Sequence, residues 1–97
     1  MATYVTLMKF TDQGIKDVKN LPARVEKAIA TWERMGGKMV AFYLTMGQYD
    51  IVTIGEAPND EVAAAFALGL GAEGNVRTEA LRAFSQDQAG AIVKALS

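Results

Sequence analysis

The sequence contains neither cysteine nor histidine among its 97 residues. Without cysteine the chain has no disulfide, no thiolate nucleophile and no thiolate-bound metal. Without histidine it also lacks the commonest general base, the commonest metal ligand and every histidine-based catalytic triad. We therefore expect no metal site and no bound cofactor. Composition alone points to no reaction.

The chain also lacks a dominant charge. Ten basic residues face eleven acidic ones, and the isoelectric point is near 5.3. A protein without a strongly basic surface is a poor partner for nucleic acid or anionic lipid, so we expect neither. The first residues show no basic segment followed by an apolar one, and no apolar run approaches the ~18 residues that cross a bilayer. We expect a cytoplasmic protein without a membrane segment.

What the chain does have is apolar residues, which make up 51% of it. A chain of this length forms one domain, here 1–97, and such a small domain has a large surface relative to its core. A high apolar content in one small domain therefore predicts apolar surface that a second copy covers.

Hydrophobic periodicity and turn residues divide the chain into seven elements. Residues 15–35 place apolar side chains on one helical face, Gly36 and Gly37 end this helix, and Ser85 to Gln88 form a capping box. The predicted strands are 3–10, 38–45, 49–56 and 75–84. The predicted helices are 15–35, either continuous or in two pieces, 58–70 and a last one that begins at the capping box. The order β-α-β-β-α-β plus a helix predicts an α+β fold, the ferredoxin-like arrangement with a four-stranded antiparallel sheet.

Two helices cover only one face of such a sheet, yet the strands are apolar on both faces. We expect the second face to form a sheet-on-sheet homodimer. The alternative is that the C-terminal helix covers an edge or part of this face. On strand 75–84, an arginine on an apolar sheet face indicates an intersubunit ion pair, a side chain reaching off the edge strand, or an anionic ligand. The predicted interface residues are Tyr4, Met8, Met39, Tyr43, Tyr49, Ile51 and Arg82.

The helix-covered side of the sheet predicts a small apolar pocket. Trp32, Phe66 and Ile54 are its expected lining, and Asp50 or Thr45 would orient a polar atom of a small apolar or aromatic ligand. The alternation predicts that Asp50 lies on the same side as Ile54, at the rim of the core, where a carboxylate can act as acid or base. The alternative is that Asp50 accepts backbone N–H groups and stabilises the turn.

Residues 69–74 read Gly-Leu-Gly-Ala-Glu-Gly and match the dinucleotide-binding pattern letter for letter. That pattern requires a preceding strand and a following helix. Here a helix precedes and a strand follows. The segment therefore indicates a helix end and a turn, and not a nucleotide site.

The segment 42–50, Phe-Tyr-Leu-Thr-Met-Gly-Gln-Tyr-Asp, resembles the signature of the GYD domain family. The segments 9–15, 56–58 and 74–78 match in the same order, so the resemblance covers nearly the whole chain. The residues that give the family its name correspond to Gly47, Tyr49 and Asp50. The resemblance implies a small bacterial or archaeal protein with a dimeric α/β-barrel of ferredoxin-like fold, and brings no established reaction.

Two functions remain open at this point. The first is a homo-oligomeric module that binds a small molecule or builds an assembly, which the apolar faces and the missing histidine and cysteine favour. The second is a cofactor-independent monooxygenase-like or isomerase-like enzyme that acts on a small apolar substrate. There Asp50 and tyrosines such as Tyr43 or Tyr49, or Lys9, would transfer protons.

Overall fold

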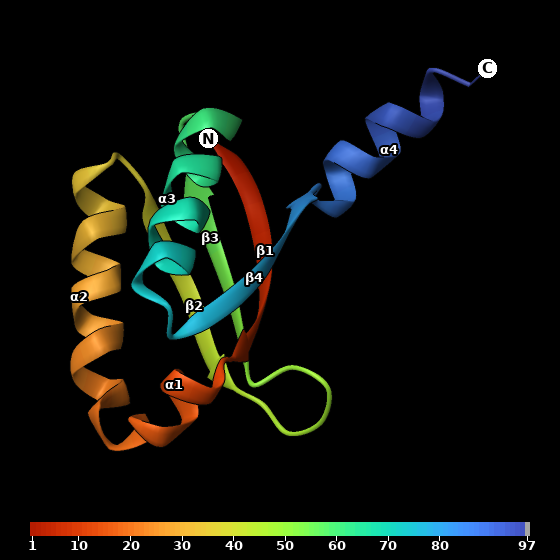
Figure 1. Ribbon diagram of the computed structural model, residues 1–97. Coiled ribbons are helices and arrows are strands. Elements are labelled where there is room, and N and C mark those ends of the chain that lie inside the picture. Colours follow the sequence, from red (N-terminus) through yellow and green to blue (C-terminus); the bar gives the residue numbers. More distant parts are fainter. Residues whose placement is uncertain (97) are drawn as a thin grey trace.

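The computed structural model describes residues 1–96 and has the predicted order of elements, with one helix divided (Figure 1). The strands and helices, with a short 3-10 turn η1, are β1 (Ala2–Phe10), α1 (Asp12–Lys16), η1 (Val18–Asn20), α2 (Leu21–Arg34), β2 (Lys38–Leu44), β3 (Ile51–Ala57), α3 (Asp60–Glu73), β4 (Val76–Ala83) and α4 (Gln86–Lys94).

The four strands form one antiparallel sheet in the order β2-β3-β1-β4. This is the ferredoxin-like order, so the predicted fold class is confirmed. Helices α2 and α3 lie on one face of this sheet (Figure 1). The register of the central pair places Val5 opposite Ile54 and Leu7 opposite Val52. On the other side of β1, Val5 lies opposite Leu81.

Local signals explain where the helices begin and end. The Asn59 side chain caps α3 by accepting the N–H of Val62 at 2.9 Å, and Gly74 ends it with a φ of 86°. The predicted helix 58–70 therefore begins two residues later and ends three residues later than expected. The capping box of α4 between Ser85 and Gln88 is present as predicted.

The predicted helix 15–35 divides because a second cap precedes it. The Thr11 side chain accepts the N–H of Gly14 and starts α1, which ends after one turn and leads through η1 into α2. Gln13 donates to the Asn75 side chain at 2.9 Å and to the Glu73 carbonyl at 3.1 Å. These bonds fasten α1 to the turn between α3 and β4.

The prediction of which strand residues face the helices is wrong. Tyr4, Met8 and Ile51 are buried under α2 and α3, and Met39 lies on the same side. Val52 and Ile54 instead face away, in register with Leu7 and Val5. Both sets of side chains are apolar, so alternation fixes which residues share a face but not which face the helices cover.

The core below the helices is small and divided into two clusters. Tyr4, Trp32 and Ala57 form one, and Met8, Ile51 and Val76 form the other. No large side chain is completely buried in the part of the chain that the structure describes. The accessible area of 6490 Å² exceeds the roughly 5,400 Å² expected for this mass.

Helix α4 accounts for part of this excess. It extends away from the sheet on the side opposite α2 (Figure 1), and all its residues are exposed. The radius of gyration is 14.6 Å, against about 12.5 Å for a globular domain of this length. Helix α4 therefore covers neither the open face nor an edge, contrary to the alternative that the sequence left open.

Replacing Gly14 by alanine tests the contact between α1 and the start of β4. A Cβ at this position would overlap the backbone carbonyl of Asn75, so G14A is expected to lower the free energy of unfolding by about 2 kcal/mol. Gly69, in α3, has open space around it, and G69A is expected to raise the free energy by about 0.5–1 kcal/mol. Urea unfolding at one protein concentration measures both. Equal effects of the two changes would contradict this account of Gly14.

Candidate functional site

Two surfaces of the domain are candidates for function, one on each side of the sheet. The first is a cavity between the sheet and helices α2 and α3. The second is the open face of the sheet, with the segments that project beside it. The residues expected in one site from the sequence are divided between these two surfaces.

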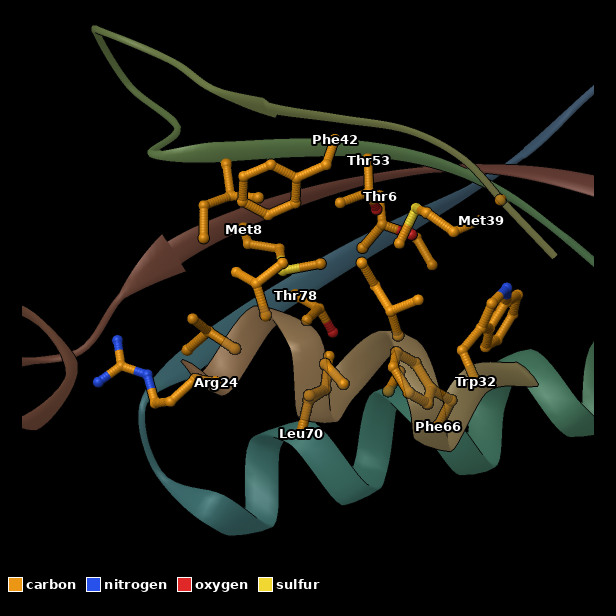
Figure 2. A pocket seen from close by; sticks show the side chains of 18 of the residues that line it. Thr6, Met8, Arg24, Trp32, Met39, Phe42, Thr53, Phe66, Leu70 and Thr78 are labelled. Atoms are coloured by element: carbon orange, nitrogen blue, oxygen red, sulfur yellow. The ribbon is translucent and has the colours of Figure 1, made fainter. Parts of the chain in front are cut away.

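The cavity has a volume of about 100 Å³ and walls that are mostly apolar. Figure 2 shows Met8, Phe42 and Met39 reaching down from the sheet toward Phe66, Leu70 and Trp32 on the helices. The rings of Trp32 and Phe66 meet edge to face, with centroids 4.9 Å apart. Trp32 and Phe66 therefore line the cavity where the sequence placed them. The full lining also includes three threonines, Thr6, Thr53 and Thr78, which the sequence analysis did not single out.

Trp32 is held by two glycines that the sequence analysis also missed. A Cβ at Gly37 would collide with the indole ring, and a Cβ at Gly55 would lie 3.2 Å from its nitrogen. The indole is 6% exposed, and its N–H has no hydrogen-bond partner among residues 1–96. The sequence does contain a signal for one of them. Gly55 lies in the middle of a strand, where a glycine often marks the close approach of another group.

Asp50 and Thr45 hold the loop between β2 and β3 in place and do not line the cavity. The Asp50 carboxylate accepts a hydrogen bond from the backbone N–H of Phe10 at 2.8 Å. The backbone N–H of Asp50 donates to the Met8 carbonyl. The Thr45 hydroxyl donates to the Tyr49 carbonyl at 2.6 Å. The contacts of Asp50 therefore match the alternative that it accepts a backbone N–H group and stabilises the loop. The N–H group belongs to Phe10 of β1 and not to the loop itself.

The centre of the open face is apolar. Two rows of side chains cross the sheet, the first formed by Ala41, Ile54, Val5 and Leu81 and the second by Tyr43, Val52, Leu7 and Glu79. Tyr43 is 58% exposed, so a large aromatic ring lies on a face that no other element covers. Of the predicted interface residues, Tyr43 therefore lies on the open face.

Charged groups lie at both ends of this face. Tyr49 donates its hydroxyl to Glu79 at 2.8 Å, and the Lys9 ammonium lies 5.4 Å from the centre of the Tyr49 ring. The hydrogen bond to Glu79 is the main reason that the pKa of Tyr49 is raised above its ordinary value. At the other end, Lys38 is in register with Glu56.

A third group of side chains lies near the start of α3. The Tyr4 hydroxyl donates to the Asp60 carboxylate, and the Arg82 guanidinium lies 5.8 Å from the Tyr4 ring and 4.6 Å from the Phe84 ring. Burial is the largest cause of the raised pKa of Tyr4, followed by the bond to Asp60. Arg82 therefore leans on aromatic rings, and no ion pair joins it to a carboxylate within the described chain.

Groups of acidic side chains that could hold a metal ion are absent from residues 1–96. Within the same residues, no helix combines the length and the apolar character needed to cross a bilayer. The GxGxxG-like segment lies at the end of α3 and in the turn before β4, as expected for a helix end.

The amino-acid sequence is similar to a known protein family and to a named protein. The family model of the GYD domain matches residues 4–93. A protein of Thermus thermophilus named "Glutamine synthetase and cystathionine beta-lyase binding protein" is 33% identical over 84 residues, which cover 86% of this chain and 88% of the relative. The similarity therefore extends over nearly the whole of both proteins.

Replacing Asp50 by asparagine tests its structural role. The variant keeps the shape of the side chain but weakens a charge-assisted bond to the Phe10 N–H, so the free energy of unfolding is expected to fall by about 1–2 kcal/mol. Asp87, in the exposed first turn of α4, is the matched control, and D87N should change stability by less than about 0.5 kcal/mol. Urea unfolding distinguishes the two, and an unchanged stability of D50N would contradict the assignment.

The raised pKa of Tyr4 predicts a loss of stability in alkali. Tyr4 is neutral in both states well below pH 10. Near and above pH 10 it ionises first in the unfolded chain, because its pKa is raised in the folded one, and this ionisation lowers the free energy of the unfolded chain relative to the folded chain. We expect the free energy of unfolding to fall as the pH rises above 10, and to fall less steeply in Y4F. Urea unfolding between pH 8 and pH 11 measures both slopes. Parallel slopes would show that Tyr4 is not responsible.

Proposed function

The chain belongs to the GYD domain family, and from that premise and its uncovered sheet face we propose that it is a binding and assembly module that works as a homodimer or larger homo-oligomer. One observation carries the proposal. The face of the sheet opposite α2 and α3 has an apolar centre, and no element of the described chain lies over it. An antiparallel sheet with a solvated face is normally polar on that face.

A second copy of the chain fits this face better than solvent does. Each end of the face carries charges of both signs, with Lys9 and Glu79 at one end and Lys38 and Glu56 at the other. A two-fold axis brings the same patch of both copies together, so acidic groups can lie opposite basic ones while the apolar centres meet. The proposed interface then includes Tyr43 and Tyr49 from the sequence prediction, with Val5, Leu7, Val52 and Ile54 in place of the residues buried under the helices.

Helix α4 supports the same assembly. Its apolar residues Ala89, Ile92 and Val93, together with Leu96 just after its end, follow a helical spacing. Ile92, Val93 and Leu96 are more than half exposed. An isolated helix of nine residues is barely stable in water, so it needs a surface to pack on. It projects away from the sheet on the side opposite α2 (Figure 1). We propose that α4 packs against this second copy.

The relative from Thermus supports a role in binding other proteins. Its name describes binding to two enzymes, and it matches this chain over 88% of its own length. For this chain we propose the general class only, namely that the homo-oligomer docks on a protein partner. The enzyme alternative needs Asp50 beside a bound substrate, whereas the Asp50 carboxylate is bonded to the Phe10 N–H and lies outside the cavity lining.

Replacing Val52 by aspartate tests the assembly. Val52 is in the middle of the open face, so V52D would bring two like charges into the proposed dimer interface and weaken the association at least about 100-fold. Leu68, 75% exposed in α3 and outside the open face, provides the control L68D. Analytical ultracentrifugation should find the native protein and L68D at an even multiple of 10.4 kDa and V52D at one subunit. A native protein that remains monomeric at micromolar concentration would contradict the proposal.

A further inference from the structure

A groove between α2 and α3 adjoins the cavity under the helices. This groove has a volume of about 410 Å³ and is lined in part by small residues, among them Ala28, Ala65 and Gly69. Ala28, Phe66 and Leu70 line both the groove and the inner cavity. The groove and the cavity therefore lie next to each other and share part of their walls.

The inner cavity is apolar on the helix side and carries hydroxyl groups on the sheet side. Thr6 and Thr53 are direct cross-strand neighbours, and Thr78 lies one strand further, opposite Met8. Figure 2 shows these threonines on the strands, above Phe66 and Leu70. Thr53 is only 7% exposed, and within residues 1–96 no hydrogen bond joins the hydroxyls of these three threonines to the protein.

Within residues 1–96, the indole N–H of Trp32 in the cavity wall is the buried side-chain polar group without a partner. Leaving such a group unpaired costs about 1–3 kcal/mol. The threonine hydroxyls line the cavity without protein partners and are free to bond to water or to a ligand oxygen. Neighbouring residues on adjacent strands have Cβ atoms about 5 Å apart, so one ligand oxygen can lie between Thr6 and Thr53.

The charges at the cavity exclude an ionic ligand. Arg24 and Glu73 are the charged residues in its lining. Arg24 is bonded to the Asp17 carboxylate at 3.1 Å, and the Glu73 carboxylate is 53% exposed, 4.0 Å from Lys27. Neither group is free to neutralise a charge placed among Trp32, Phe66 and Thr53, and an unpaired buried charge is strongly unfavourable.

We propose that this cavity binds an uncharged, mainly apolar small molecule of the size of one ring, with a hydroxyl or carbonyl oxygen that bonds to Thr53 and Thr6. A dry cavity of ~150 Å³ in another protein holds benzene, so one ring would fill this cavity of about 100 Å³ and extend partly into the adjoining groove. The inference deepens the binding role proposed above by giving the chemical class of the ligand.

The test uses phenol, toluene and benzoate, which share one ring and differ in polarity and charge. Trp32 is the only tryptophan and lies in the cavity wall, so its indole N–H gives one signal in a ¹H–¹⁵N NMR spectrum that reports on the cavity. Phenol is expected to shift this signal saturably, and benzoate to bind at least about tenfold more weakly. Absence of a saturable shift with phenol at millimolar concentration overturns the proposal.

Replacing Thr53 by valine tests the role of the hydroxyl without changing the shape of the side chain. T53V is expected to weaken the binding of phenol about fivefold relative to the binding of toluene, because one hydrogen bond is lost. If the ratio of the two dissociation constants is the same in both proteins, the hydroxyl does not hold the ligand. The cavity then holds its ligand by apolar contact alone, and the proposed bond to Thr53 is overturned.

A matched pair in α3 shows whether the probe is inside the cavity. Ala67 lines the cavity and Ala64 does not, so A67L is expected to abolish the phenol-induced shift and A64L to preserve it. Equal shifts in A67L and A64L place the probe elsewhere and overturn the proposal. Because V52D changes only the opposite face, it should bind phenol as the native protein does. Failure of the assembly and failure of the cavity are thus measured separately.

Discussion

The structure depends on a sheet that is apolar on both faces while only one face is covered by helices of the same chain. Tyr4, Met8 and Ile51 face α2 and α3, and Val5, Leu7 and Val52 face away. Burial of apolar area is the main source of folding free energy, and at 97 residues the covered side supplies a small, divided core. Further apolar area that could be buried lies on the open face, which is why we propose assembly as the function.

Several polar contacts fix the ends of the strands and so determine where both faces lie. The Asp50 carboxylate bonds to the N–H of Phe10 and ties the loop between β2 and β3 to the end of β1. At the same end of β1, α1 is joined to the α3–β4 turn through Gln13 and Asn75. The residues that look most suited to proton transfer in the sequence therefore hold the scaffold. The centres of the candidate binding surfaces are formed mainly by uncharged side chains.

The cavity results from the way two helices cover a wide sheet. Helices α2 and α3 are separated by a groove lined partly by alanine and glycine, so they do not close over the strands completely. Trp32 and Phe66 fill one part of the space and leave another part next to Thr53. Because the cavity and the open face lie on opposite sides of the same strands, a bound molecule and a second copy do not compete for the same residues.

The sequence by itself determined the element order, the α+β class, the helix caps and the membership of Trp32 and Phe66 in the pocket, because periodicity and capping are local properties. It also predicted an uncovered apolar face. Only the tertiary structure decided which face this is. Side chains alternate along β1, and both alternating sets are apolar, Tyr4 and Met8 on one face and Val5 and Leu7 on the other. The same reversal removed Ile54 from the pocket, and the position of Asp50 depended on a bond to a residue 40 positions away. Such contacts are set by strand pairing across the whole chain, which local sequence patterns do not record.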